Sequence, residues 1–408
     1  MTWIDYRTAK TPAFSRKDFN VFPEKSTLVL SSFEKSIIEE LAQSITANPY
    51  NLKQQEDFVI SVKKLGNHCF KESRDFITEE LNHGFGAVLI KGLPTDQDLP
   101  NTPAQGGSIS DGTKTTYISE AILLALGMTT GSEPFNFRQE GRGTAPLIDN
   151  IVPVKHLKSQ KGAGGFDNNF PFHCESAWHR KRPDYLVLLG LREASDAKTL
   201  IFSSNMLKNT RWETESVKMK NSFRLKAPDL YVQMQNIGLP IGTENYSNLA
   251  PISLENGGLI MNINFNGTDC KDMASVGWLS ELEDFIEEQA VGAVISPGNA
   301  IILNNYRTCH TRTSFSPTFN GMDRWFQRAY FKKDLWQSND HTEQRETFEK
   351  ELIEDLINTG WMTKDLSLTA EFMQYVYHPE HMKGLEGYQA KLAAVAVNFT
   401  PIAGSRIV

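Results

Sequence analysis

Residues 170–192 read FPFHCESAWHRKRPDYLVLLGLR and join a candidate metal-binding motif to a β-rich run. His173 and Glu175 are two positions apart, so in an extended strand their side chains point to the same face and can share one ion. The same spacing also occurs by chance in many proteins, where the two side chains simply face solvent. The motif therefore predicts a metal site only if a third ligand can be found.

His310 is the natural third ligand, because it ends the run AIILNNYRTCH (300–310) after the turn-forming residues SPGN (296–299). Two histidines and one carboxylate form the facial triad of non-haem iron enzymes, which leaves adjacent coordination positions open for substrates and oxygen. The pattern predicts a mononuclear iron site built from these three residues.

Short β-rich runs separated by turn residues recur between about 146 and 335, which is typical of an antiparallel β-sandwich or barrel. One helix with an apolar stripe, SVGWLSELEDFIEEQA (275–290), interrupts them. The runs are DYLVLLGLR (184–192), TLIFSS (199–204), SFRLKAP (222–228), GGLIMNINFNG (257–267), AVISPGNAIILNN (293–305) and RWFQRAYFKK (324–333).

The flanking segments have a helical period. Apolar residues recur three and four apart over 32–45 and 56–84, which predicts two amphipathic helices, and FGAVLIKGLP (85–94) reads as a buried strand. The composition after residue 340 is again helical. Two polar, Gly-rich segments, 101–114 and 158–169, are expected to be surface loops that border a site.

Composition narrows the function classes. The 42 Lys and Arg residues are scattered and face 49 Asp and Glu residues, for a net charge of −7, so nucleic acid is not an expected partner. The four cysteines form no CxxC pair, which fits a reducing compartment. We find no signal peptide and no apolar run long enough to cross a bilayer, so a cytoplasmic protein without membrane contact is expected.

The motifs FHCES and RTxFxPxxxGxDRWxQR resemble one known family. With PFHCESAWHRKRPDYLVLLGLR and NNYRTCHTRTSFSPTFNGMDRWFQR as its core, the chain is similar over about 135–334 to the clavaminate-synthase-like branch of the iron(II)/2-oxoglutarate oxygenases. That branch includes hydroxylases of free arginine, asparagine and lysine. The resemblance implies one oxygenase domain over 1–408, mainly β with flanking helices (α+β). It has a jelly-roll core at 135–335, a helical flank at 1–100 and a helical extension at 336–408.

The resemblance implies a role for each matching residue. His173, Glu175 and His310 would bind Fe(II). Arg324 would hold the far carboxylate of the cosubstrate 2-oxoglutarate, helped by the hydroxyl of Thr199. A carboxylate among the ligands also disfavours halogenation, which needs room for a halide.

Three further residues match substrate contacts of the family. Arg328, four positions after Arg324 and on the same strand face, would clamp the α-carboxylate of an amino acid, with a surface position at the strand edge as the alternative. Gln139 would lie near the α-amino group, and Asp229 would belong to a lid loop. Loop alignments drift, so both of these could equally be ordinary loop residues.

The strand LIMNINFNG (259–267) departs from the arginine hydroxylases, because Asn262 and Asn264 stand where those enzymes carry an acidic pair. A planar guanidinium favours bidentate carboxylates, whereas an ammonium can be satisfied by amide carbonyls, so the departure favours lysine. The alternative is that both asparagines only form the turn before Gly267.

Other polar residues near the triad have simpler explanations. His179 reads as a structural or surface residue in a polar turn. Cys174 and Cys309 flank ligands, but strand alternation turns them to the opposite face, where packing is the expected role.

The function implied is hydroxylation of an unactivated C–H at C3 or C4 of a free L-amino acid, with 2-oxoglutarate and O₂ converted to succinate and CO₂. L-Lysine is the first candidate, followed by L-arginine and other polar amino acids. Desaturation, cyclisation, a carrier-tethered substrate and a non-catalytic metal-binding jelly roll remain alternatives. The sequence gives no oligomeric state, although its apolar helical ends are compatible with a homo-oligomer (a homodimer or tetramer).

Overall fold

The fold is known from a computed structural model of the 408-residue chain. It describes residues 3–10, 18–51, 53–104, 114–136, 147–159, 164–178, 182–194, 196–219, 221–226, 246–255 and 258–333. The chain divides into two compact units, of which the first comprises 1–134, 147–226 and 247–333. Of the second, 135–146, 227–246 and 334–408, only residues 135, 136 and 246 are described. The helical extension expected at 336–408 therefore lies outside the described residues.

The apolar run Tyr185–Arg192 forms strand β7 in a seven-stranded sheet. β7 is buried along nearly its whole length, and it pairs antiparallel with β15 and β17. The sheet order is β3 (Thr27–Val29), β4 (Ala87–Lys91), β15 (Ala300–Asn304), β7, β17 (Trp325–Lys332) and β5 (Glu133–Phe135), and β6 (Asp149–Ile151) also pairs with β17. The large sheet thus takes β3 and β4 from the flanking segment 1–100, where the buried strand predicted at 85–94 is confirmed as β4 and β3 was not predicted.

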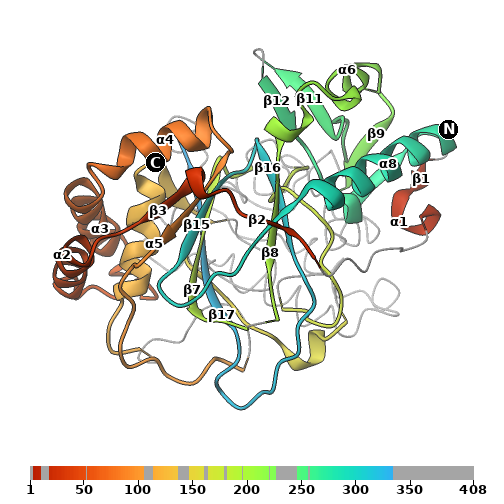
Figure 1. Cartoon of the computed structure of the whole chain (residues 1–408). Coiled ribbons are helices and arrows are strands. Elements are labelled where there is room, and N and C mark those ends of the chain that lie inside the picture. Colours follow the sequence, from red (N-terminus) through yellow and green to blue (C-terminus); the bar gives the residue numbers. More distant parts are fainter. Residues whose placement is uncertain are drawn as a thin grey trace, which may run out of the picture. The chain divides into compact units, whose positions relative to one another are not determined.

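A second sheet carries the other half of the core. Its order is β16 (Thr308–Arg312), β8 (Thr199–Ser203), β14 (Val291–Ala293) and β2 (Asn20–Val21). In Figure 1, β8 and β16 are drawn beside the strands of the large sheet, and helix α8 (Met273–Gln289) lies at the other side of β8. The strands form the expected jelly-roll core, and the protein as a whole mixes helices and sheets.

Smaller elements complete the described chain. A four-stranded sheet has the order β1 (Ile4–Asp5), β13 (Thr268–Cys270), β9 (Phe223–Lys226) and β10 (Tyr246–Ser247), and β11 (Ile252–Glu255) forms a hairpin with β12 (Gly258–Met261). The short helices are α1 (Tyr6–Ala9), α6 (Arg211–Lys218), η1 (Glu24–Ser26), η2 (Lys155–Leu157), η3 (Ser204–Leu207) and η4 (Phe265–Gly267).

Four helices cover the outer face of the large sheet: α2 (Ser32–Gln43), α3 (Gln55–Cys69), α4 (Ser73–Asn82) and α5 (Ile118–Met128). Ser31 begins α2 with a capping box to Glu34, as its sequence favours. The single helix predicted over 56–84 is wrong, because the chain breaks between Cys69 and Ser73 into α3 and α4.

Helix α5 was not predicted, because ISEAILLALGM is buried on almost every side and shows no polar stripe. It packs directly on β17: a Cβ at Gly127 would come within 2.0 Å of the Phe331 ring. A side chain at this position would force the Phe331 ring to move, so glycine allows α5 to pack closely on the strand that carries Arg328.

Two apolar clusters stabilise the arrangement. One joins the helices α2 to α5 to the outer face of the large sheet, and the other joins α8 to β8, β9 and β12. Between them the inner faces of the strands carry polar side chains. No described helix is both long enough and apolar enough to span a membrane.

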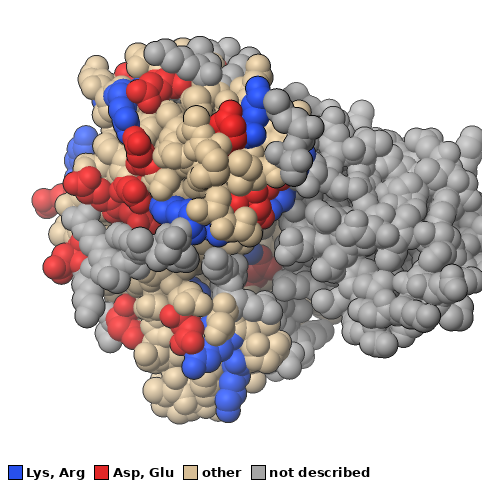
Figure 2. Space-filling model, turned by 90° about the vertical axis from the view of Figure 1, so that its right-hand side faces the viewer, with Lys and Arg blue, Asp and Glu red and all other residues tan. Residues whose placement is uncertain are grey.

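Figure 2 shows the charged side chains of the described residues on one face of the protein. On the face shown in Figure 2, acidic side chains gather along one edge, and basic side chains lie in small groups near them. The charged residues of this face thus form mixed groups.

Candidate active site

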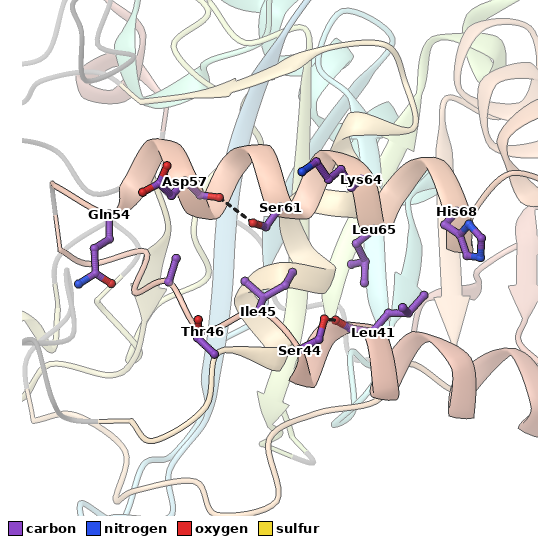
Figure 3. A pocket seen from close by; sticks show the side chains of 11 residues that line it. Leu41, Ser44, Ile45, Thr46, Gln54, Asp57, Ser61, Lys64, Leu65 and His68 are labelled. Carbon is purple, nitrogen blue, oxygen red and sulfur yellow. Dashed lines mark hydrogen bonds between the residues drawn. The ribbon is translucent and has the colours of Figure 1, made fainter.

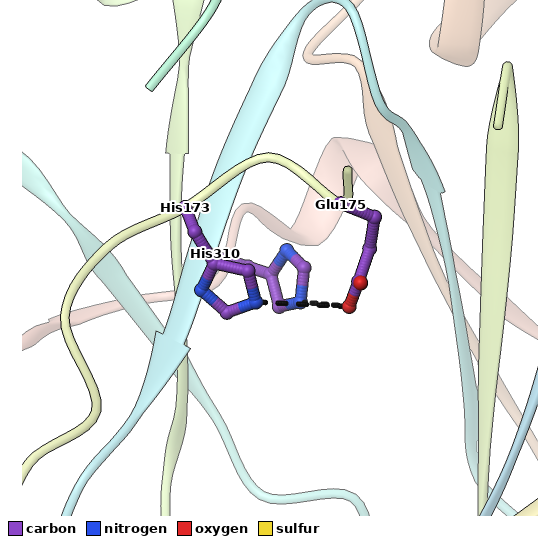
Figure 4. A group of neighbouring side chains, drawn as sticks. All are labelled: His173, Glu175 and His310. Carbon is purple, nitrogen blue, oxygen red and sulfur yellow. Dashed lines mark ion pairs between the residues drawn. The ribbon is translucent and has the colours of Figure 1, made fainter. Parts of the chain in front are cut away.

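The three predicted metal ligands lie together. The Nε2 atoms of His173 and His310 are each 3.6 Å from Glu175 Oε1, and the candidate ligand atoms all lie within 4.8 Å of one another. Figure 4 shows both imidazoles and the carboxylate turned toward a common point. Among the described residues, this is the one group of three such side chains that could hold a metal ion.

Backbone pairing places the two histidines. His173 N–H donates to His310 O (3.1 Å) and His310 N–H donates to His173 O (2.9 Å), so the residues face each other directly across an antiparallel bridge. Their side chains project to the same side, with ring centroids 4.5 Å apart. His310 of β16 and His173 of the motif FHCES are thereby brought to one point.

Glu175 reaches the same point from a turn, whereas an extended strand was expected. Only His173 makes the bridge, and the chain turns at Ser176, whose φ is 47°. The buried side chain of Asn305 holds this turn: its Oδ1 accepts from Glu175 N–H (2.8 Å), and its Nδ2 donates to the carbonyls of Glu175 and Pro183 (both 2.9 Å). Sequence analysis did not find this role of Asn305, although it lies beside β15 in the quoted motif NNYRTCH.

The Glu175 carboxylate is held ionised. Arg328 Nη1 donates to Oε1 (3.0 Å), and the Tyr330 hydroxyl donates to Oε2 (2.9 Å). Burial alone would raise the pKa of Glu175, but Arg328 and the two imidazoles hold that pKa well below its usual range. Burial raises the pKa of Tyr330 well above its usual value, so its hydroxyl keeps the proton that it donates.

The histidines present nitrogen lone pairs. Burial and the neighbouring His173 lower the pKa of His310 to about 4, so His310 is neutral near pH 7, as metal binding requires. His173 Nδ1 lies 3.0 Å from Pro171 O, and an N–H donated there leaves Nε2 free as a ligand. A buried carboxylate with two imidazoles is a donor set that fits Fe(II).

Arg324 is a buried cation in the same pocket. Its side chain is 6% exposed, its guanidinium lies 3.7 Å from the centre of the Phe326 ring, and its Nε has no hydrogen-bond partner. No carboxylate of the described residues pairs with it. Burial and the neighbouring Arg312 lower the pKa of Arg324 to about 9. A buried cation without a counter-charge fits an anionic ligand, and the far carboxylate of 2-oxoglutarate meets this requirement.

The three candidate ligands and Arg324 line one pocket of about 60 Å³. The three candidate ligands, Thr199, Arg324 and Arg328 form its polar wall together with Arg312. Ile151, Phe170, Leu188 and Phe326 form its apolar wall. The structure thus brings together every described residue that sequence analysis assigned to the metal and the cosubstrate.

Arg328 lines the pocket as predicted, but it already has two partners. Its guanidinium contacts Glu175 and, through Nη2 (2.8 Å), Asp149 of β6. Asp149 was not predicted to contribute. Tyr330 was also missed, although it is two positions after Arg328 and strand alternation places both on one face.

Asn262 and Asn264 do not line the pocket. Asn262 Nδ2 donates to Ala250 O (2.9 Å) and to Ser253 Oγ (3.3 Å), and Asn264 Oδ1 accepts from Gly267 N–H (3.1 Å) at the start of η4. Asn264 thus forms the turn before Gly267, as the alternative has it, whereas Asn262 bonds to residues 250 and 253, and neither contact supports a role in reading the substrate.

The other residues singled out in the sequence fall into two groups, one outside the described residues and one in the apolar core. Gln139, Asp229 and His179 lie outside the described residues. Cys174 and Cys309 are buried in the apolar cluster beneath α8, where packing is their role, as expected.

A larger groove of about 700 Å³ lies between α2 and α3, lined by Ser44, Thr46, Gln54, Lys64 and His68 among others (Figure 3). It contains no group of three potential metal ligands among the described residues, and no buried unpaired charge. The smaller pocket is therefore the candidate active site.

Comparison with known proteins agrees with this geometry, although no family model matches the chain. L-asparagine oxygenase of Streptomyces coelicolor is 29% identical over 266 residues, which cover 62% of this chain and 73% of that protein. L-lysine 3-hydroxylase of Catenulispora acidiphila is 25% identical over 346 residues, which cover 80% and 89%. Clavaminate synthase 2 of Streptomyces clavuligerus is 26% identical over 252 residues, which cover 61% and 74%.

Solved structures show the same fold. Asparagine oxygenase in complex with Fe(II), 3-hydroxyasparagine and succinate has a TM-score of 0.66 at 23% identity, covering 79% of this chain and 98% of that one. The non-haem iron oxygenase OrfP in complex with Fe and α-ketoglutaric acid (2-oxoglutarate) has a TM-score of 0.66 at 20% identity, with coverage of 79% and 98%. The chain is thus a homologue of free amino acid hydroxylases and has the fold of the non-haem iron(II)/2-oxoglutarate-dependent oxygenases.

Proposed function

We propose that the protein hydroxylates a free L-amino acid at C3 or C4 in a reaction that depends on Fe(II), 2-oxoglutarate and O₂. One observation carries this proposal: the cluster of His173, Glu175 and His310 shares a pocket with Arg324, a buried cation without a described counter-charge. The cluster of three ligands suits iron, and the cation of Arg324 suits a dicarboxylate that also reaches the iron.

Each residue has a definite task in this proposal. His173, Glu175 and His310 would hold the iron, which would supply the oxidative chemistry. Arg324 and Thr199 hold the far carboxylate of 2-oxoglutarate. The bound iron and cosubstrate supply the oxidation: O₂ is consumed, 2-oxoglutarate loses CO₂ and becomes succinate, and one oxygen atom enters a substrate C–H bond. The protein positions that bond and excludes water.

Arg328 is the proposed clamp for the substrate carboxylate. It is one of three guanidinium groups in the pocket wall, and it lies beside the candidate metal ligand Glu175. A carboxylate that binds there holds the α-carbon near the iron, which brings C3 or C4 within reach. Gln139 and Asp229 are proposed to contact the amino group and to close over the substrate.

L-Lysine is the first substrate to test. The lysine 3-hydroxylase of C. acidiphila aligns over 80% of this chain, compared with 62% for the asparagine oxygenase. Relatives that act at C3 of lysine, and of ornithine and arginine, make C3 the first position to examine. Arginine and asparagine are the matched alternatives.

The experiment incubates the enzyme with Fe(II), 2-oxoglutarate and each of the twenty amino acids, and measures succinate and product mass. We expect one amino acid to gain one oxygen atom, with lysine giving the highest kcat/KM. Cadaverine, which lacks the carboxylate that Arg328 would bind, should be a very poor substrate. A product that is two hydrogen atoms lighter than the substrate would indicate desaturation in place of hydroxylation. Efficient turnover of cadaverine would contradict the role of Arg328.

A further inference from the structure

Arg312 stands beside the cosubstrate end of the pocket, and neither the sequence motifs nor the proposed function give it a role. It is two positions after His310 on β16, so both side chains project to the same face. In the pairing of β16 with β8, Arg312 lies opposite Thr199. Thr199, Arg312 and Arg324 all line the pocket, so Arg312 shares it with both residues proposed for the cosubstrate.

Arg312 is as buried as Arg324, with 6% of its surface exposed. Its guanidinium donates to the backbone carbonyls of Gly165, Asn168 (3.2 Å) and Thr313 (3.1 Å). Its Nε has no hydrogen-bond partner, and no carboxylate in the described part of the chain pairs with it. Carbonyl groups orient a guanidinium but do not neutralise it, so its full charge remains in the pocket.

The guanidinium groups of Arg312 and Arg324 lie near the same aromatic ring. The guanidinium of Arg312 lies 5.3 Å from the centre of the Phe315 ring, and that of Arg324 lies 5.5 Å from the same centre. Burial lowers the pKa of Arg312 to about 10. Two buried like charges without an anion are costly, and a ligand carboxylate at this end of the pocket would offset that cost.

We propose that Arg312 is a positioning residue that makes the site select a 2-oxo acid with a second carboxylate. It adds a second positive charge beside Arg324, and it holds the carbonyls of Gly165 and Asn168 against the end of β16. Arg324 contacts the carboxylate, and Arg312 strengthens that contact. The inference rests on the proposed function, because it assumes that 2-oxoglutarate enters this pocket.

The test compares two cosubstrate probes that differ only in the second carboxylate: 2-oxoglutarate and 2-oxopentanoate. Their dissociation constants are measured by calorimetry with the Fe(II)-loaded enzyme in the absence of O₂, so the readout does not depend on turnover. Arg312→Gln removes the charge but keeps donors for the backbone carbonyls, and Arg312→Lys keeps the charge. Arg211→Gln, on the exposed surface of α6, is the matched control.

We expect Arg312→Gln to weaken 2-oxoglutarate binding about three- to thirtyfold, while 2-oxopentanoate binding changes by less than about twofold. Arg312→Lys should keep most of the preference for the dicarboxylate. An equal loss for both acids, or no loss for either, would overturn the inference. If Arg312→Gln does not fold, the lysine variant decides: a folded Arg312→Lys that has lost the preference also overturns it.

The same titrations separate this inference from the proposed function. Wild-type enzyme that binds no 2-oxoglutarate removes both. Wild-type enzyme that binds 2-oxoglutarate, with unchanged binding in the Arg312 variants, removes only the role of Arg312. Normal 2-oxoglutarate selectivity without hydroxylation of any free amino acid removes only the substrate assignment.

Discussion

Arg328 and Asp149 face each other across the pair of strands β17 and β6, and one carboxylate oxygen of Asp149 accepts from both Nη2 (2.8 Å) and Nε (3.3 Å) of Arg328. The remaining nitrogen of the same guanidinium, Nη1, reaches Glu175. One arginine therefore connects a carboxylate of β6 to a candidate metal ligand. The proposed substrate clamp is oriented by this pair before any substrate arrives.

We predict that Asp149→Asn weakens the clamp and leaves the cosubstrate site intact. The amide cannot match the charge-assisted pair, so Arg328 loses its fixed orientation. The KM for the amino acid should rise about three- to thirtyfold, and the dissociation constant for 2-oxoglutarate should stay within about twofold. The control is Asp184→Asn, which removes the negative charge of an ion pair with Lys332 of β17. An unchanged KM would show that Asp149 does not orient Arg328.

A second prediction concerns Tyr330, whose hydroxyl donates to Glu175. Tyr330→Phe removes one hydrogen bond from the carboxylate and keeps the ring. Because groups that orient metal ligands typically contribute about ten- to a hundredfold to metal affinity, Fe(II) binding should weaken by about tenfold. The control is Tyr185→Phe, which removes a hydroxyl bonded to Asn82. Equal Fe(II) affinities in the two variants would argue against the role of Tyr330.

A third prediction concerns Arg324. Its replacement by Met removes the charge-assisted pair to the 2-oxoglutarate carboxylate, worth about 1.5–3 kcal/mol, and 2-oxoglutarate affinity should fall about ten- to a hundredfold. Fe(II) affinity should not change. Anaerobic titration of the Fe(II)-loaded enzyme measures the effect, with Arg211→Met as the control. Wild-type affinity in the Met variant would move the anchor to another residue.

A fourth prediction separates the two explanations of Asn262. The structure shows its amide N–H₂ bonded to Ala250 O and Ser253 Oγ. Asn262→Asp replaces this donor by an acceptor, so we expect the free energy of unfolding to fall by about 1–3 kcal/mol. The ratio of kcat/KM for arginine to that for lysine should stay the same. A variant of normal stability with a raised ratio would restore the sequence-based hypothesis that Asn262 reads the substrate.

The motifs carried enough information for the centre of the site. The four-residue spacing of Arg324 and Arg328 places both side chains on one face by strand alternation, whereas the two-residue spacing of His173 and Glu175 marked the right pair although Glu175 reaches the site from a turn. The same alternation places Arg312 on the strand face of His310, and Tyr330 on the strand face of Arg328. Alternation thus explains the two predicted arginines, and it could have found two residues that were missed.

Other features depend on tertiary contacts that no local pattern contains. Asp149 meets Arg328 through the pairing of β6 with β17, between segments far apart in the chain. Helix α5 is buried on nearly all sides, so it shows no amphipathic period. Asn264 was assigned by its place in a strand, but its side chain accepts from Gly267 and begins η4.

The most direct test of the iron site compares the wild-type enzyme with His310→Ala, with His68→Ala, an exposed histidine of α3, as the control. Succinate and hydroxylated amino acid are measured together in the presence of Fe(II), 2-oxoglutarate and the preferred amino acid, and circular dichroism checks the fold. We predict that wild type and His68→Ala each form one succinate for every hydroxylated amino acid. Folded His310→Ala should form neither product. Hydroxylation by His310→Ala at the wild-type rate, or a wild-type enzyme that forms no succinate with any free amino acid, would contradict the account.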